Sequence, residues 1–249
     1  FWDVSSDIIQ QKYDFKNLGV KAQDDGKILI LNYASPSNQS DPGTRYLILT
    51  RLNADGTYDN TFNGTSFLII HQSEANYNIY SSQYYIPFNN LNVYNNQFIV
   101  ACNPVSENNG LILKGNSDAT FDATFGNNGQ KIIALQGINS NDIAKKTLIQ
   151  ADGKILVCGS GSGPYVSIVR YNNNGSIDNT FGNQGMYLSA TPFQQYLGNL
   201  DFGLQSDGKI IFNLKNQSSG ANEIIRLNAN GTSESNFTTV FGFVSQGSY

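Results

Sequence analysis

Four basic residues recur along the chain, and each is followed eight residues later by an acidic residue. The pairs are Arg51 with Asp59, Lys114 with Asp122, Arg170 with Asp178, and Arg226 with Glu234. Such a cation and carboxylate can form a charge-assisted ion pair that clamps a loop to a strand, within one sheet or between neighbouring sheets. The four cations could instead form a ring that binds an anion. Because only 14% of the residues are charged, the recurrence of this charged pair at four equivalent places favours the structural clamp.

Oxygen-bearing side chains recur at alternating positions within the same segments. The sets are Asn53, Asp55 and Asp59; Asn116, Asp118 and Asp122; and Asn172, Asn174 and Asp178. Calcium loops use oxygen ligands in a similar pattern. Two of these loops offer two carboxylates and the third only one, and none has a glutamate where an EF-hand has its bidentate ligand. Because Asn and Asp are also favoured in tight turns, we expect turns without a metal, and bound calcium is the less favoured alternative.

Catalytic chemistry has little support in the sequence. His71 is the only histidine, so the chain cannot form a zinc cluster built on several histidines, and a Ser–His–acid triad would have to use this residue. No glycine pattern of the nucleophile-elbow type accompanies a serine. Glycosidase-type carboxylate pairs are possible in principle, but the repeated acids already have an explanation in turns and ion pairs. We therefore expect a protein that is not an enzyme and has no catalytic residues or cofactor.

The composition excludes two further classes of partner. The net charge is −4 and the isoelectric point is about 4.9, which argues against nucleic acid because phosphate binding needs a basic surface. No apolar run approaches the roughly 20 residues that a membrane-spanning helix needs.

These candidate residues are positioned by a tandem repeat. The segment from Gln150 to Val157 returns at Gln23 to Ile30 and at Gln205 to Phe212, and a second motif around the basic–acidic pair follows each copy. Phenylalanines anchor the period at Phe1, Phe62, Phe125, Phe181 and Phe237. We therefore expect one domain with units of approximately 1–61, 62–124, 125–180 and 181–236, and with 237–249 as a closing segment.

Within a unit, apolar residues alternate with a period of two rather than 3.6. In the third unit the pattern predicts strands over 144–150, 154–158, 166–171 and 186–190, with a compact loop over 176–185. Asp152 and Gly153 predict a two-residue type I′ hairpin turn. Four short antiparallel strands in each of four units of about 59 residues predict an all-β fold, a β-propeller of four-stranded blades. A closed four-blade ring, in which the two ends share or meet at one blade, and an arc of a larger ring remain equal alternatives.

The two cysteines occupy positions that differ by one residue between repeats. Cys158 aligns with Ala101 rather than with Cys102, so the two side chains should lie on opposite faces of their strands. We therefore expect two buried free thiols and no disulfide.

The two motifs, Gln-x-Asp-Gly-Lys-Ile-Leu-Val and Arg-Tyr-Asn-x-x-Gly-Ser-x-Asp-x-Thr-Phe-Gly, resemble the delta-60 repeat, a β-propeller-like family of bacterial secreted and cell-surface proteins. The second unit departs from the pattern, with Val93 to Val100 in place of the first motif. The resemblance implies an extracytoplasmic location, in the periplasm, at the outer membrane or at the cell surface. It also implies bacteria of the Bacteroidetes type and a possible association with type 9 secretion, and it supplies no catalytic residues.

The repeat is least regular between the first and second units. The added residues carry five aromatic side chains, namely Tyr77, Tyr80, Tyr84, Tyr85 and Phe88. Exposed aromatics on a loop are effective anchors for a protein partner, although some of them could instead build the first strand of the second blade. We expect a non-catalytic propeller that binds a protein partner, such as an outer-membrane or secretion-system protein. A carbohydrate-binding adhesin module and a hydrolase on a propeller scaffold are the alternatives.

Overall fold

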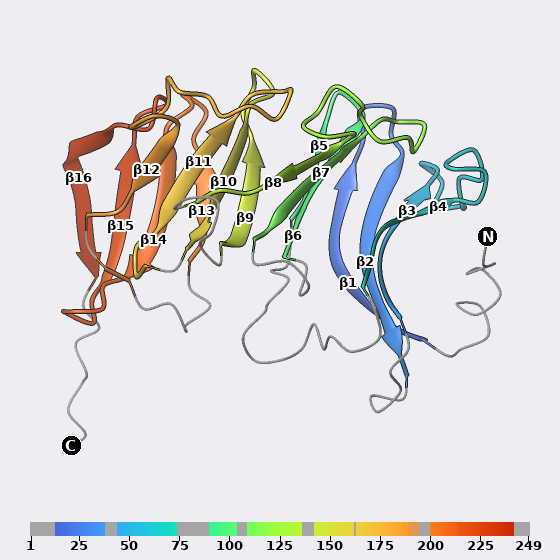
Figure 1. The fold of residues 1–249 in the computed structure, drawn as a ribbon, viewed down its shortest axis with the longest axis horizontal. Helices are drawn as coiled ribbons and strands as arrows, with labels where there is room; N and C mark the ends of the chain where they lie inside the picture. The colour runs from blue at the N-terminus through green and yellow to red at the C-terminus, as the bar shows by residue number, and fades with distance from the viewer. Residues whose placement is uncertain are drawn as a thin grey trace. The chain divides into compact units, whose positions relative to one another are not determined.

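The computed structural model describes residues 13–37, 44–73, 90–103, 109–135, 142–161, 163–190, 192–193 and 200–241. The chain forms two compact units, Phe1–Ile132 and Ile133–Tyr249. Each unit contains two four-stranded antiparallel sheets (Figure 1). The predicted all-β fold with four-stranded blades is thus confirmed. The described residues contain no helix, and so none that is long and apolar enough to cross a membrane.

Each sheet of the first unit is built from one continuous stretch of chain with its strands in sequence order. The first sheet contains β1 (Tyr13–Ala22), β2 (Ile28–Pro36), β3 (Arg45–Leu52) and β4 (Phe67–Ser73). The second sheet contains β5 (Leu91–Tyr94), β6 (Gln97–Cys102), β7 (Leu111–Gly115) and β8 (Gln130–Ile132). The five aromatics of the irregular segment lie outside the described residues.

The second unit follows the same plan. Its third sheet contains β9 (Ile143–Ile149), β10 (Ile155–Ser160), β11 (Ser167–Tyr171) and β12 (Met186–Leu188). The fourth sheet contains β13 (Phe202–Leu204), β14 (Ile210–Lys215), β15 (Asn222–Leu227) and β16 (Ser233–Phe241). The strands of the third sheet agree with the prediction to within two residues at each end. In the described residues β1 and β16 belong to different sheets, so no sheet joins the two ends of the chain.

Alternating side chains build the core between the two sheets of each unit. In the first unit, Leu29 and Leu31 of β2 share a buried cluster with Phe98 and Val100 of β6. In the second unit, Leu156 and Cys158 of β10 pack in the same way against Phe212 and Leu214 of β14. The first strands of paired sheets lie beside each other, β1 against β5 and β9 against β13. Each unit is therefore two blades stacked face to face.

Both cysteines are buried, as predicted, and neither belongs to a disulfide. Cys102 belongs to β6 and Cys158 to β10. Burial raises the pKa of Cys158 far above its usual range. Its thiol is therefore part of the apolar core rather than a reactive group.

The prediction of a type I′ turn at Asp152 and Gly153 is wrong. Gly153 has a φ of 80°, but Asp152 is not among the residues with positive φ. The amide of Gly153 donates to the carbonyl of Gln150 at 2.9 Å, and the amide of Gln150 donates to the carbonyl of Lys154 at 2.9 Å. These bonds enclose a three-residue loop, a turn that ends in a left-handed glycine.

The two-residue form occurs instead in the divergent second unit. Asn95 and Asn96 both have positive φ, at 48° and 60°, and Tyr94 pairs directly with Gln97. Asparagine tolerates the left-handed region better than most residues, which lets this hairpin do without glycine.

Candidate functional site

The repeated basic–acidic pair lies at the end of the third strand of each sheet. In the first three sheets a long loop follows this strand, whereas in the fourth sheet Glu234 already belongs to β16. In the first sheet, Arg51 is near the end of β3, and the amide of Asp59 donates back to the carbonyl of Arg51 at 3.1 Å. A further antiparallel bridge joins Leu52 and Tyr58. The backbone therefore folds the loop against its own strand and brings residues eight apart side by side.

A tight turn separates the two residues. The amide of Asn53 donates to the carbonyl of Thr57 at 2.8 Å, and Gly56, with a φ of 85°, donates to the carbonyl of Asn53 at 3.0 Å. One carboxylate oxygen of Asp55 accepts both the amide and the hydroxyl of Thr57, at 2.9 and 2.7 Å. The turns of the other three sheets repeat this pattern at Asp118 and Thr120, at Asn174 and Ser176, and at Asn230 and Thr232.

In the first sheet the carboxylate of Asp59 is saturated by four donors. Its Oδ2 accepts the Nε of Arg51 at 2.7 Å and the Nζ of Lys27 at 3.0 Å. Its Oδ1 accepts the amide and the hydroxyl of Thr61 at 3.1 and 2.6 Å. Arg51 and Asp59 are both buried. The structure therefore joins the basic and acidic residues, together with a second cation from the first hairpin.

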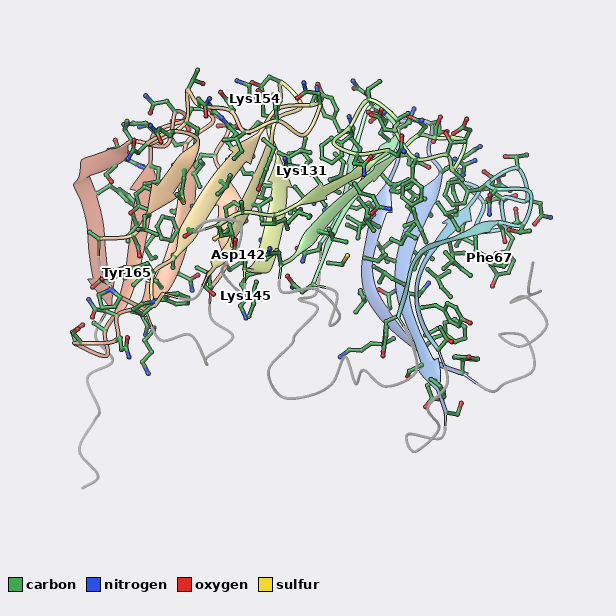
Figure 2. The ribbon with its side chains drawn as sticks, in the orientation of Figure 1. Phe67, Lys131, Asp142, Lys145, Lys154 and Tyr165 are labelled. Carbon is green, nitrogen blue, oxygen red and sulfur yellow. The ribbon has the colours of Figure 1, made fainter. Side chains whose placement is uncertain are left out.

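The third sheet repeats this network almost atom for atom. Asp178 pairs with Arg170 at 2.8 Å and with Lys154 at 2.9 Å, and its other oxygen accepts from Thr180. Figure 2 shows Lys154 at the hairpin end of the sheet, far from Asp142 at the opposite end of β9.

The second and fourth sheets keep the network with substitutions. Lys114 pairs with Asp122 at 3.0 Å, and Gln97, at the position that Lys27 has in the first sheet, donates to Asp122 at 3.3 Å. In the fourth sheet, Glu234 pairs with Arg226 at 2.5 Å and with Lys209 at 3.2 Å.

Hydrogen bonds and cations keep these carboxylates ionised. For Asp59, the hydrogen bond from Thr61 is the main cause, and it overcomes the effect of burial and holds the pKa well below the usual range. Burial favours a higher pKa for Asp122, but the hydrogen bonds from Thr124 and Lys114 outweigh it and lower the pKa to about 2. For Asp178, burial is likewise outweighed by bonds that include those from Thr180, and the pKa is lowered. Such groups cannot act as general acids near neutral pH.

A phenylalanine lies under each repeated cation, and it is buried in the first three sheets and partly buried in the fourth. The guanidinium carbon of Arg51 is 4.5 Å from the ring centre of Phe62, and that of Arg170 is 4.8 Å from the ring of Phe181. The corresponding pairs in the other two sheets are Lys114 over Phe125 and Arg226 over Phe237. This placement adds a cation–π attraction to the ion pair.

The arginines also join neighbouring sheets. Nη1 of Arg51 donates to the carbonyl of Ser117, which lies in the turn of the second sheet. Nη1 of Arg170 donates to the carbonyl of Ala229 in the turn of the fourth sheet, at 2.8 Å. One guanidinium thus binds its own loop and the backbone of the next blade.

The oxygen atoms of the calcium-like loops are occupied by these turns and ion pairs. Asp55 bonds to Thr57 and Asp59 bonds to two cations and to Thr61, as described above. Within the described part of the chain, no group of three or more His, Cys, Asp or Glu residues is placed to hold a metal ion.

Among the described residues, one buried acid lies outside the repeated motifs, and no sequence motif marks it. Asp142 is buried just before β9, and its Oδ2 accepts the amide of Leu135 at 2.6 Å. The amide of Ala134 donates to the hydroxyl of Tyr171 at 3.0 Å. These bonds tether the segment before β9 to the third sheet. No equivalent residue recurs, so no periodicity could have revealed this acid.

The sequence prediction also missed the second cation. Lys27, Lys154 and Lys209 all occupy the last position of the Gln-x-Asp-Gly-Lys motif, and all three contact the repeated acid. The recurrence of a lysine at the end of this motif in three units is the sequence signal that could have identified the second cation.

The blades and the repeated clamp define a β-propeller repeat protein. The model of a family described as a domain of unknown function (DUF5122) beta-propeller matches residues 23–62, 150–181 and 205–237. This family is related to the delta-60 repeat family that the motifs resemble. Each matched segment contains the Asp-Gly-Lys hairpin, the arginine and the anchoring phenylalanine, and the divergent second unit is not matched.

Two solved structures are similar to the chain at low identity. The WD40 domain of SCAP from fission yeast has a TM-score of 0.41 and 9% identity, and the match covers 95% of this chain and 50% of that one. A putative exo-beta-1,3-galactanase from Bifidobacterium bifidum s17 has a TM-score of 0.38 and 8% identity, with 87% and 69% covered. The chain thus spans half the length of the first of these structures. No curated protein matches the sequence.

Proposed function

We propose that the protein is a non-catalytic, extracytoplasmic propeller that binds another protein. The observation that carries this proposal is the saturation of the repeated carboxylates. Asp59 and Asp178 each accept bonds from two cations and from a threonine. Groups that are fully engaged in holding a blade together are not available to bind or protonate a substrate.

Binding is then expected where the repeats differ. The segment between β4 and β5 breaks the period and carries Tyr77, Tyr80, Tyr84, Tyr85 and Phe88. Tyrosine and phenylalanine supply large contact areas and are common among the residues that dominate protein interfaces. These five residues are therefore our proposed contact surface. The resemblance to delta-60 repeat proteins supports a partner in the bacterial envelope, such as an outer-membrane or type 9 secretion protein.

A pull-down from native cell envelope tests this proposal. Tagged wild-type protein is expected to recover one partner in constant ratio, and the double variant Tyr84→Ala/Tyr85→Ala is expected to recover much less of it. Tyr58→Ala is the matched control, because this tyrosine is 67% exposed but belongs to a repeated turn. Equal recovery by wild type and the double variant would contradict the proposed surface. Clear hits on a glycan array without any protein partner would favour the adhesin alternative.

A further inference from the structure

The contact between neighbouring sheets is a repeated junction with two complementary halves. One half is the arginine with its phenylalanine, Arg51 with Phe62 or Arg170 with Phe181. The other half is the tight turn of the next sheet, which offers a backbone carbonyl and a small residue. The carbonyls are those of Ser117 and Ala229.

The small residue of the turn packs beside the phenylalanine ring. Ala119 is buried in the same cluster as Phe62. A Cβ atom added at Gly231 would lie 2.7 Å from the ring of Phe181. In addition, the amide of Gly182 donates to the carbonyl of Asn230 at 2.7 Å. Both junctions therefore have a polar contact and a ring contact, and the junction of the second unit also has a backbone contact.

The fourth sheet carries an arginine half that lacks this complement. Among the described residues, the contacts of the Arg226 side chain are with Glu234 and the ring of Phe237. Its side chain is 23% exposed, compared with 4% for Arg51 and 8% for Arg170. Arg226 pairs with Ile211 across β14 and β15, so it lies on the face opposite Phe212 and Leu214, which pack in the core of the unit.

The first sheet carries the unmatched turn half. Gly56 is exposed, and a Cβ atom added there would meet no atom within 4 Å. On the same sheet, Phe15 is 50% exposed and Val20 is 53% exposed. They pair with Ala34 and Ile30, so they lie on the face opposite the buried Leu29 and Leu31. The same face carries the buried cluster of Ala34, Tyr46 and Ile48, so it is apolar, and it exposes Phe15, Val20 and the turn at Gly56.

We propose that these two halves bind each other between two copies of the chain, head to tail. The fourth sheet of one copy covers the first sheet of another, and the guanidinium of Arg226 donates to the carbonyl of Ala54, the residue equivalent to Ser117 and Ala229. Phe237 lies against Gly56 as Phe181 lies against Gly231. We choose a second copy of the chain as the partner, because an arginine half and a turn half already bind each other inside each unit. The proposal concerns self-association and is independent of the envelope partner above.

Light scattering coupled to size-exclusion chromatography tests this, with protein at roughly 1 to 100 µM. The wild-type chain is expected to give a mass of at least twice the 27.3 kDa of one copy. Arg226→Ala is expected to weaken association roughly 10- to 100-fold, the effect of losing a charged hydrogen bond. Val20→Asp is expected to abolish association, because it places a charge in the apolar contact. Leu188→Asp, at a residue 47% exposed on β12, is the matched control and should associate like wild type.

Mixing the two variants gives the sharper result. Val20→Asp retains an intact fourth sheet and Arg226→Ala retains an intact first sheet, so the mixture can form one unaltered junction and should yield a dimer with one copy of each. Melting curves of the separate variants establish that both are folded. A wild-type monomer at the highest concentration would overturn the proposal, and so would association that neither variant weakens. A mixture that stays monomeric while wild type associates would exclude the head-to-tail arrangement.

Discussion

Arg170→Ala removes a side chain that has partners in its own loop and in the neighbouring sheet. Its Nε is 2.8 Å from Asp178, its Nη1 donates to the carbonyl of Ala229 at 2.8 Å, and its Nη2 donates to Thr180 at 3.1 Å. The guanidinium also covers the ring of Phe181. The substitution therefore breaks a buried ion pair and a contact between two sheets at once.

The expected cost is about 3 kcal/mol. Removing one partner of a buried ion pair typically destabilises a protein by about 3–5 kcal/mol, because a charge is left buried without compensation. Here Lys154 remains 2.9 Å from Asp178 and still offsets its charge, which places the effect at the low end of that range. A loss of about 3 kcal/mol is a large fraction of the roughly 5–15 kcal/mol that stabilises a typical domain.

Amide hydrogen exchange is the suitable assay, because it reports the stability of one unit separately from the other. Amides of β10 and β11 should exchange roughly 100-fold faster in Arg170→Ala than in wild type. Lys146→Ala is the control, since it also removes one positive charge from the second unit. Its partner Asp201 has a side chain that is 71% exposed, and surface ion pairs contribute about 0–1 kcal/mol. Equal effects of the two variants, or an unchanged rate in Arg170→Ala, would refute the clamp.

Three further substitutions test the turns and the titration of the network. Gly56→Ala should lower the free energy of unfolding by only about 1 kcal/mol, because of its positive φ. Gly231→Ala should lower it by about 2–4 kcal/mol, because the added methyl group also meets the ring of Phe181. Urea unfolding midpoints at low protein concentration measure both losses, and equal losses would contradict the junction. Asp122→Asn should destabilise the protein at pH 7 by leaving Lys114 without its counter-charge. Because the folded pKa of Asp122 is lowered to about 2 from 3.8, its stabilisation is present above pH 4 and is lost as the pH falls towards 2. The difference in the free energy of unfolding between Asp122→Asn and wild type, measured by urea titration, should shrink over that interval. A difference that does not change with pH would show that the ion pair is not the source of the stabilisation.

Periodicity made the blades predictable. Alternating apolar residues between turn signals gave the four strands of the third sheet, because a strand that packs on one side must alternate. The basic–acidic pairing could also be predicted, because a basic and an acidic residue recur eight residues apart in every unit of a chain with few charges. The structure places all four pairs in contact.

Other features depend on information that side-chain patterns do not contain. The acceptors of Arg51 and Arg170 in the next sheet are backbone carbonyls, and a carbonyl has no residue type to repeat. The hairpin at Gly153 was predicted with a loop one residue too short, because Asp-Gly is compatible both with a type I′ turn and with a three-residue loop that ends in a left-handed glycine. Loop length is set by the register of the flanking strands, which the local sequence does not specify.

The divergent second sheet shows which property of the repeat the fold requires. Lys114 replaces the arginine, Gln97 replaces the lysine, and Ala119 takes the turn position of glycine at a φ of 74°. Despite these changes, Asp122 still accepts a cation and an amide donor, and its turn still closes with a bond from Ala119 to Asn116 at 3.1 Å. A binding site for one ligand would tolerate such exchanges poorly, because arginine and lysine present different donor geometry. Hydrogen-bond connectivity survives where residue identity does not, and this is the behaviour of a structural network. The recurrence of the motif therefore reflects the construction of each blade, and for this reason our proposed partner contact lies in a segment that the blades do not share.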